Sequence, residues 1–208
     1  MPEPFAVLTG DLIDSTSLDL TQLNDALQAL ENASRDIAGW GGGIVTGFAR
    51  RGGDGWQCAI AVPALSLRAA LFLRAALREL GKSRSTRIAI AEGLGTLPAD
   101  RNPNSGHGPA FIASGRLLAT LPAHVAMAHA AKGDLAAAVR LADHISSGWT
   151  PAQARAVRLM LWPRDRIRAD AAKHLGITRQ AVNQALWGAG FPAIDDALRM
   201  IEAKGCAT

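Results

Sequence analysis

Two aspartates, Asp11 and Asp54, stand where carboxylates could hold a divalent metal ion. Asp11 follows the apolar residues 5–9, which predict a buried strand, and Asp54 lies in the glycine-rich segment 50–55. Glycine accepts the positive φ of a tight turn, so this segment predicts a β-hairpin with Asp54 near its tip. A sheet that places the strand beside the hairpin would bring both carboxylates to one edge. Because magnesium-bound phosphates require paired hard oxygens, the pattern indicates a site for Mg2+ or Mn2+; a purely structural role as turn residues is the open alternative.

A second group of residues, in the C-terminal part of the chain, has side chains suited to DNA. Residues 168–187 read RADAAKHLGITRQAVNQALW. Small Ala172 would let two helices cross closely, and Gly176 would accept the left-handed conformation of the turn between them, as a helix-turn-helix requires. Leu175, Ile177 and Val182 are expected in the core of this unit. We expect DNA contacts from Arg168, Lys173, Thr178, Arg179, Gln180, Asn183 and Gln184, with Thr178 also capping the second helix.

The positive charge of the chain is concentrated in this same segment. The net charge is +4; the first 148 residues carry thirteen basic and thirteen acidic residues, whereas residues 149–208 carry nine and five. Such a local excess favours binding to phosphates, because Lys and Arg release the counterions condensed on DNA. Further candidate phosphate contacts are Arg155, Arg158, Arg164 and Arg166. An ordinary helical domain with a solvated basic face is the alternative.

The elements that must position these residues can be outlined from periodicity and turn signals. A capping box at Asp19 and Gln22 opens a helix to about residue 37. The expected elements that follow are a hairpin of residues 44–49 and 56–62, a helix at 65–80, a strand at 87–91, a loop at 93–108, a helix at 113–121, a strand at 124–128 and a helix at 134–147. This order predicts an α+β fold, with a ferredoxin-like antiparallel sheet and helices on one face over residues 1–147. A small all-α helix-turn-helix domain is expected over residues 148–208.

Composition restricts the class of protein. Hydrophobic residues make up 49% of the chain and charged residues 19%, which is typical of a globular protein with one moderate core. No apolar run reaches the length needed to span a bilayer and the first residues lack a signal peptide, so we expect a cytoplasmic protein without a membrane partner. The two cysteines and five histidines show no metal-ligand spacing, and no Ser-His-Asp or Cys-His constellation indicates a hydrolase.

Four segments of the first 130 residues resemble class III nucleotidyl cyclase catalytic domains, in the same order. They are residues 8–16 (LTGDLIDST) and 53–56 (GDGW), similar to the two metal motifs, residues 87–93 (RIAIAEG), similar to a core strand, and residues 108–117 (GPAFIASGRL), similar to the helix of the transition-state arginine. The chain as a whole resembles the SatD-like family, through residues 10–15 (GDLIDS), residues 53–57 (GDGWQ) and the helix-turn-helix end. Its C-terminal segment is similar to sigma-factor region 4.

The cyclase resemblance implies specific roles. Asp11 and Asp54 would hold two divalent ions, Arg50 or Arg51 would approach the triphosphate of a nucleotide, and Arg116 would face the reacting phosphate across a homodimer interface. One position departs from the pattern: cyclases carry a ribose-orienting asparagine four residues before that arginine, and here the residue is Ile112.

Three functions follow from these patterns. The first is a DNA-binding regulatory protein whose cyclase-like part binds a nucleotide or divalent metal, or mediates dimerisation. The second is an active nucleotidyl cyclase or nucleotidyltransferase-like enzyme that uses Asp11 and Asp54 as metal ligands, and Ile112 argues against it. The third is a scaffold with a vestigial site. The expected partners are double-stranded DNA, a nucleoside triphosphate or related nucleotide, and a second copy of the chain.

Overall fold

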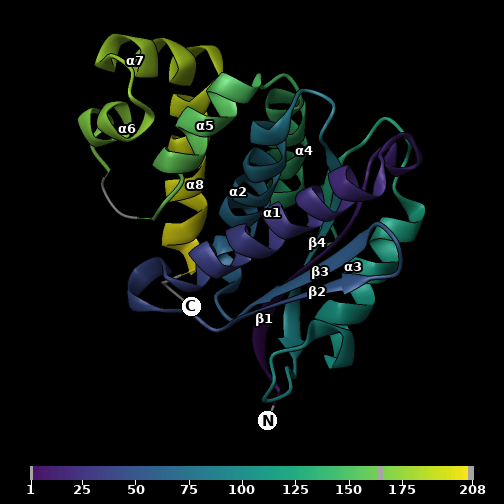
Figure 1. Ribbon diagram of the computed structural model, residues 1–208. Coiled ribbons are helices and arrows are strands. Elements are labelled where there is room, and N and C mark those ends of the chain that lie inside the picture. The colour runs from purple at the N-terminus through teal and green to yellow at the C-terminus, as the bar shows by residue number, and fades with distance from the viewer. Residues whose placement is uncertain (1, 164–165, 206–208) are drawn as a thin grey trace.

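The computed structural model describes residues 2–163 and 166–205, in which an α+β fold has five strands and eight α-helices (Figure 1). In chain order they are β1 (Glu3–Leu12), α1 (Leu20–Ala38), β2 (Thr46–Arg51), β3 (Gly55–Ile60), α2 (Ser66–Leu80), β4 (Thr86–Gly95), α3 (Pro109–Thr120), β5 (Met127–His129), α4 (Asp134–Ser147), α5 (Pro151–Met160), α6 (Arg168–Leu175), α7 (Arg179–Gly188) and α8 (Phe191–Gly205). None of the helices in the described ranges is long and apolar enough to cross a membrane.

The five strands form one sheet in the order β2-β3-β1-β4-β5. Neighbours among the first four strands are antiparallel, and β5 pairs parallel to β4. The expectation of a wholly antiparallel sheet is therefore wrong, because the connection through α3 returns the chain to the sheet edge in the direction of β4, as a helical crossover does. The predicted hairpin is confirmed, with Asp54 in the turn between β2 and β3.

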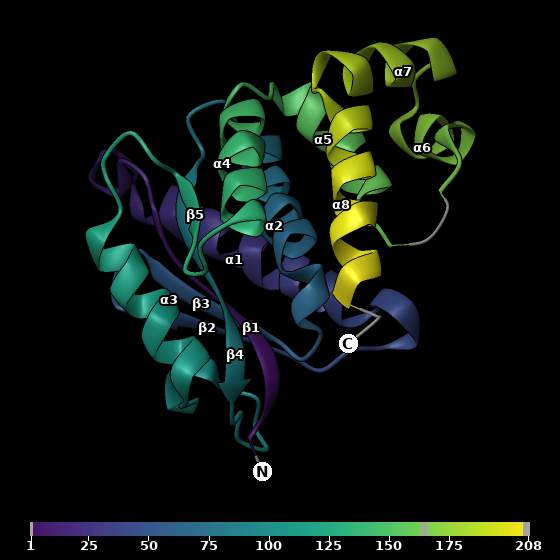
Figure 2. The ribbon, with the colours of Figure 1, turned by 180° about the vertical axis from the view of Figure 1, so that it is seen from behind.

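Helices cover both faces of the sheet, which corrects the expectation of helices on one face. Figures 1 and 2 show α1 and α2 on one face and α3 on the other. Ala6 and Leu8 of β1 face the main core, whereas Phe5 and Val7 pack with Phe111 of α3. A strand that is apolar on both sides needs cover on both sides, and the continuous apolar run of β1 carried this signal.

Local signals explain where several helices begin. The side chain of Asp19 accepts a hydrogen bond from the backbone of Gln22, and the side chain of Gln22 accepts one from the backbone of Asp19, so the predicted capping box is confirmed. The helix expected at 134–147 is confirmed as α4. α3 begins at Pro109, four residues before the expected start, because proline is favoured at the first helical position.

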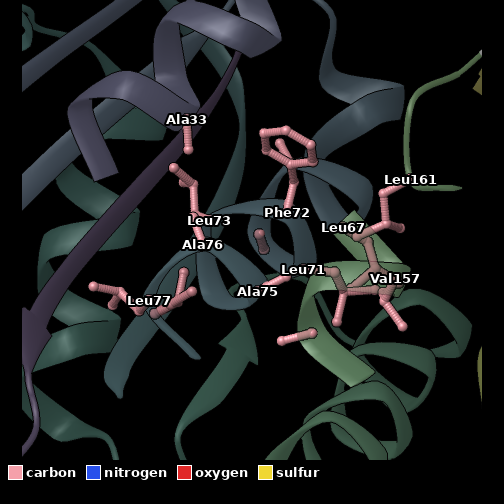
Figure 3. Packing of buried hydrophobic residues seen from close by; sticks show 14 of the residues in the cluster. Ala33, Leu67, Leu71, Phe72, Leu73, Ala75, Ala76, Leu77, Val157 and Leu161 are labelled. Atoms are coloured by element: carbon pink, nitrogen blue, oxygen red, sulfur yellow. The ribbon is translucent and has the colours of Figure 1, made fainter. Parts of the chain in front are cut away.

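Helix α2 lies at the centre of the molecule. All its residues from Ser66 to Arg78 are buried, which is typical of a helix enclosed on every side. In Figure 3, Leu73 of α2 lies near Ala33 of α1, and on the other side Leu67 lies near Val157 of α5 and near Leu161. The sheet, α1 and the C-terminal helices thus share one apolar core through α2.

Three arginines of α2 are buried within this core. The exposed fractions of Arg68, Arg74 and Arg78 are 3%, 2% and 7%. Burying a guanidinium requires charged or polar partners close by. Arg74 donates to Asp143 of α4 (2.6 Å) and to Ser147 Oγ (3.1 Å).

The other two guanidiniums also have partners outside α2, although the Nε atoms of Arg74 and Arg78 are buried without a hydrogen-bond partner among the described residues. Arg68 forms two hydrogen bonds to the carboxylate of Glu202 in α8, of 2.6 and 3.0 Å, and a third to the carbonyl of Leu161. Arg78 donates to the backbone carbonyl oxygen of Lys82. Burial, together with the charge of Arg74, lowers the pKa of Arg78.

The boundary that we predict between residues 147 and 148 lies between α4 and α5, and packing is continuous across it. Leu67 of α2 shares a core with Val157 of α5, and Arg68 of α2 forms an ion pair with Glu202 of α8. The C-terminal helices are therefore attached to the sheet-bearing part by a core and by ion pairs.

Replacing Asp143 by alanine should destabilise the protein strongly. The change leaves the Arg74 guanidinium buried without its carboxylate, and breaking a buried pair from one side costs about 3–5 kcal/mol. The free energy of unfolding, measured by urea denaturation, should fall by that amount. The control is Asp196→Ala on the exposed face of α8, expected to change it by no more than about 0.5 kcal/mol; a loss as small in Asp143→Ala would contradict the role of the pair.

Candidate functional site

The end of β1 brings the two predicted metal ligands to one edge of the sheet. Asp11 lies opposite Gly55 of β3 and opposite Arg87 of β4, and the amide of Leu12 donates to the carbonyl oxygen of Asp54 at 3.2 Å. The hairpin that carries Asp54 depends on a close approach of its two strands. A Cβ on Gly55 would lie 2.3 Å from the carbonyl oxygen of Arg51, so this position requires glycine.

Gly10, the neighbour of Asp11, is required for a similar reason. A Cβ there would lie 2.4 Å from the carbonyl oxygen of Arg87 and 2.5 Å from the ring of Trp56. The indole Nε1 of Trp56 donates to Thr86 Oγ1 (2.9 Å), whose hydroxyl donates to the carbonyl oxygen of Asp11 (2.6 Å). The buried side chains of Trp56 and Thr86 therefore hold the backbone at Asp11 in place.

Both carboxylates already have partners within the chain. Arg87 binds Asp11 with two hydrogen bonds, from Nε to Oδ1 at 2.8 Å and from Nη2 to Oδ2. Ser15 Oγ donates to Asp54 Oδ2 at 2.5 Å. The hydrogen bonds to Asp11 and the charges of Asp11 and Asp54 raise the pKa of Arg87, although burial opposes this shift. The guanidinium of Arg87 is thus the cation that the carboxylate of Asp11 holds, and Asp54 acts on it through its charge.

This arrangement does not fit two metal ions. Both oxygens of Asp11 are occupied by Arg87, and one oxygen of Asp54 by Ser15. No cluster of three or more acidic, His or Cys side chains suited to a metal ion occurs within residues 2–163 and 166–205. Mg2+ or Mn2+ could reach Asp11 only after Arg87 has moved away, so the metal site stays a prediction.

A cleft with a volume of about 530 Å³ lies between the hairpin and α3. Of the two arginines predicted to approach a triphosphate, Arg51 lines this cleft and Arg50 does not. Arg51 lines the cleft, together with Arg116 of α3, His107, Gln57 and Asn104. Arg50 is on the opposite face of β2, where its Nη1 donates to Asn24 of α1 at 2.9 Å. Arg51 and Arg116 therefore come together in one chain, and Arg50 does not join them.

A buried chain of hydrogen bonds holds α3 beside the hairpin. Gln57 Nε2 donates to Thr9 Oγ1 at 2.9 Å, and the hydroxyls of Thr9 and Ser114 are 2.8 Å apart. Thr9 pairs with Gln57 in the sheet, two residues before Asp11 along β1 and on the same face. These bonds hold α3, the helix that carries Arg116, against the sheet beside the cleft that Arg116 lines.

In the C-terminal part, α6 and α7 are joined by the turn that the sequence predicted. Gly176 has left-handed backbone angles (φ 65°, ψ 29°), and Thr178 Oγ1 accepts a hydrogen bond from the amide of Ala181 at 3.1 Å. Ala172 and Val182 are buried as expected. Ile177 was expected in the core and is 44% exposed; that expectation is wrong because the chain turns outward after Gly176.

One face of α7 is open to solvent. The side chains of Arg179, Gln180 and Gln184 are exposed and make no hydrogen bond or ion pair with any described residue, and the same holds for the side chain of Lys173 in α6. Asn183 is half-buried, because its Oδ1 accepts a hydrogen bond from Arg168 at 3.0 Å. Arg168 and Asn183, both predicted to contact DNA, therefore link α6 to α7.

The four additional arginines predicted to contact phosphates lie in different environments. Arg158 is bonded to Asp36 of α1 and Glu79 of α2, each at 2.8 Å, so it joins α5 to the rest of the protein and is not free for DNA. Burial raises the pKa of Glu79, although Arg158 acts in the opposite direction. Arg166 lies over the ring of Trp162 at 4.4 Å. Arg155 is exposed, and Arg164 lies outside the described residues.

Two residues of these sites, Arg87 and Trp187, were not predicted as functional from the sequence. Arg87 was noticed only as the start of a strand, and its pairing with Asp11 depends on strand register. Trp187 is 67% exposed on α7. Its spacing of three and seven residues from Gln184 and Gln180 puts it on the same helical face, and this signal was available in the sequence.

Comparison with known proteins adds no assignment to these sites: no protein-family model matches the sequence, and a search of curated proteins found no significant match.

Replacing Arg87 by methionine should increase the affinity for Mn2+. The change frees both oxygens of Asp11, and charge-assisted hydrogen bonds of the kind removed are each strong enough to account for about a tenfold effect. Free Mn2+ can be followed by electron paramagnetic resonance during a titration. Arg84→Met removes the same charge from the loop before β4 and should leave the affinity unchanged, and adding Asp11→Asn to Arg87→Met should abolish the gain. Equal affinities in wild type and Arg87→Met would show that Arg87 does not compete with a metal.

Proposed function

We propose that the protein is a DNA-binding regulatory protein that reads double-stranded DNA through α6 and α7. The observation that carries this proposal is the capped, glycine-turned junction of the two helices, followed by an open face of α7 with Arg179, Gln180 and Gln184. Such junctions are typical of the helix-turn-helix, in which the second helix enters the major groove. Arginine and glutamine can each form paired hydrogen bonds to base edges.

The dimensions support this proposal. α7 has 10 residues, which corresponds to about 15 Å, and the major groove is about 12 Å wide. Figure 1 shows α6 and α7 at the end of the molecule farthest from the sheet, with the outer side of α7 unobstructed. Lys173 at the end of α6 is exposed and would contact a phosphate beside the groove. Trp187 extends the reading face with an apolar surface, suited to a thymine methyl group.

The sheet-bearing part would serve as the input half of such a regulator. The order β2-β3-β1-β4, its antiparallel pairing and the connections through α1 and α2 support the ferredoxin-like assignment. We propose that this half binds a ligand or forms a homodimer, which would present two copies of α7 to paired half-sites.

A nucleotidyl cyclase or nucleotidyltransferase-like enzyme is the second candidate, favoured by the position of Asp11 and Asp54 at one edge. The pairing of Asp11 with Arg87 and the exposed apolar side chain of Ile112 argue against it. Incubation with each nucleoside triphosphate and Mn2+, followed by mass spectrometry, should give no cyclic product. A product that disappears in Asp54→Ala would make the enzyme the better assignment. A scaffold with a vestigial site is the third possibility, and it predicts no nucleotide binding.

Two substitutions should affect DNA binding in different ways. Lys173→Ala removes a phosphate contact, so it should weaken binding to all sequences and reduce the slope of log affinity against log salt by about one. Gln184→Ala removes a base contact, so it should relax the preference at one base pair by about 1–3 kcal/mol. The measurement is a mobility-shift titration at several salt concentrations, on sequences selected from random DNA.

Lys132→Ala is the matched control, because Lys132 is an exposed cation before α4, far along the chain from α6 and α7. It should leave affinity and salt slope unchanged. If Gln184→Ala kept the wild-type preference and Lys173→Ala kept the salt slope, the assignment of α7 as the reading helix would be wrong.

A further inference from the structure

We infer that the cleft between the β2–β3 hairpin and α3 binds a small phosphate-bearing molecule. The binding itself does not depend on the DNA-binding function proposed above, although its regulatory consequence would. The residues that carry the inference are Arg51, Arg116 and His107 on the charged side, and Phe111 and Ile112 on the apolar side.

The charge of the cleft is one-sided. Its lining residues include two arginines and a histidine, and none is acidic. Neither Arg51 nor Arg116 forms an ion pair or side-chain hydrogen bond with any residue in the described ranges. The remaining arginine on this face, Arg87, is neutralised by Asp11. Two uncompensated guanidiniums that line one concave surface favour an anion, and phosphate matches the paired donors of arginine.

Strand register explains why the positive charge collects there. Arg51, Gly55, Asp11 and Arg87 lie opposite one another in one row across four strands, about 5 Å apart from strand to strand. Residues in such a row point to the same face, which is the face that α3 covers. Gly55, which has no side chain, stands between Arg51 and Asp11 in this row, and Arg116 of α3 lines the same cleft as Arg51.

The other wall of the cleft suits the body of a ligand. Ile112 is 53% exposed, and Phe111 and Pro103 form a buried apolar surface beside it. The amides of Gln57 and Asn104 also line the cleft, although each already donates one hydrogen bond, to Thr9 and to the carbonyl oxygen of Arg50 respectively. An apolar wall with a few polar groups is usual for small-molecule sites, so a ring beside the phosphate fits better than a free inorganic ion. Both arginines come from one chain, so this site would need no partner subunit.

Calorimetric titration of the whole protein tests the inference, with inorganic pyrophosphate, AMP and ATP as probes, without DNA or divalent metal. At least one nucleotide should bind, and more tightly than pyrophosphate. Arg51→Gln and Arg116→Gln should each weaken that binding about tenfold or more, as expected for a lost charge-assisted hydrogen bond. Circular dichroism and thermal unfolding verify that the variants fold, which is expected because both side chains are exposed.

Two controls separate this cleft from other basic surfaces. Arg50→Gln removes the neighbouring charge on the opposite face of β2, and Arg179→Ala removes one from the proposed DNA surface; both should bind the nucleotide as the wild type does. Absence of binding at millimolar probe concentrations would overturn the inference, and so would binding that is lost in Arg179→Ala and unchanged in Arg51→Gln. Because DNA binding is measured separately by mobility shift, failure of either proposal is visible without the other.

Discussion

The three buried guanidinium groups of α2 set the condition on which the rest of the structure depends. A charged group can be removed from water only where opposite charges and acceptors surround it. Two of the three arginines have acidic partners that are distant in the sequence: Arg74 pairs with Asp143 of α4, and Arg68 pairs with Glu202 of α8. Because Glu202 lies in α8, the C-terminal part supplies one of these carboxylates, and the two parts of the chain contribute to each other's stability.

The same contacts determine how the two candidate sites are related. Helix α2 packs against α1 and the sheet on one side and against α5 on the other, and Arg158 of α5 bonds both Asp36 of α1 and Glu79 of α2. Any movement of α1 relative to α2 would therefore disturb Arg158, and with it α5, on which α6 and α7 pack. Ion pairs between packed helices have discrete arrangements, which is the property that coupling between distant sites requires.

Patterns within a few residues predicted much of the fold. The hairpin, the capping box at Asp19, α4 and the turn at Gly176 each follow from local backbone chemistry, and each is confirmed. The features that escaped prediction depend on residues distant in sequence. Arg158 seemed free for DNA because its partners lie in α1 and α2, and Arg87 lacked a role because strand register was unknown. The choice between Arg50 and Arg51 was accessible in principle: side chains alternate along a strand, and Arg50 is opposite the buried Trp56.

The row formed by Arg51, Gly55, Asp11 and Arg87 shows why a likeness in motif does not determine the chemistry of a site. A cyclase-like pair of aspartates needs cations supplied from solution, whereas here Arg87 supplies one from the next strand. With Asp11 paired to Arg87, the charges that line the cleft are those of Arg51 and Arg116, which is the basis for the anion site inferred there. Withdrawal of Arg87 from Asp11 would free a carboxylate for a metal ion and add a third guanidinium to the anion-binding side. Metal binding at the aspartates and phosphate binding in the cleft would therefore be linked through one side chain.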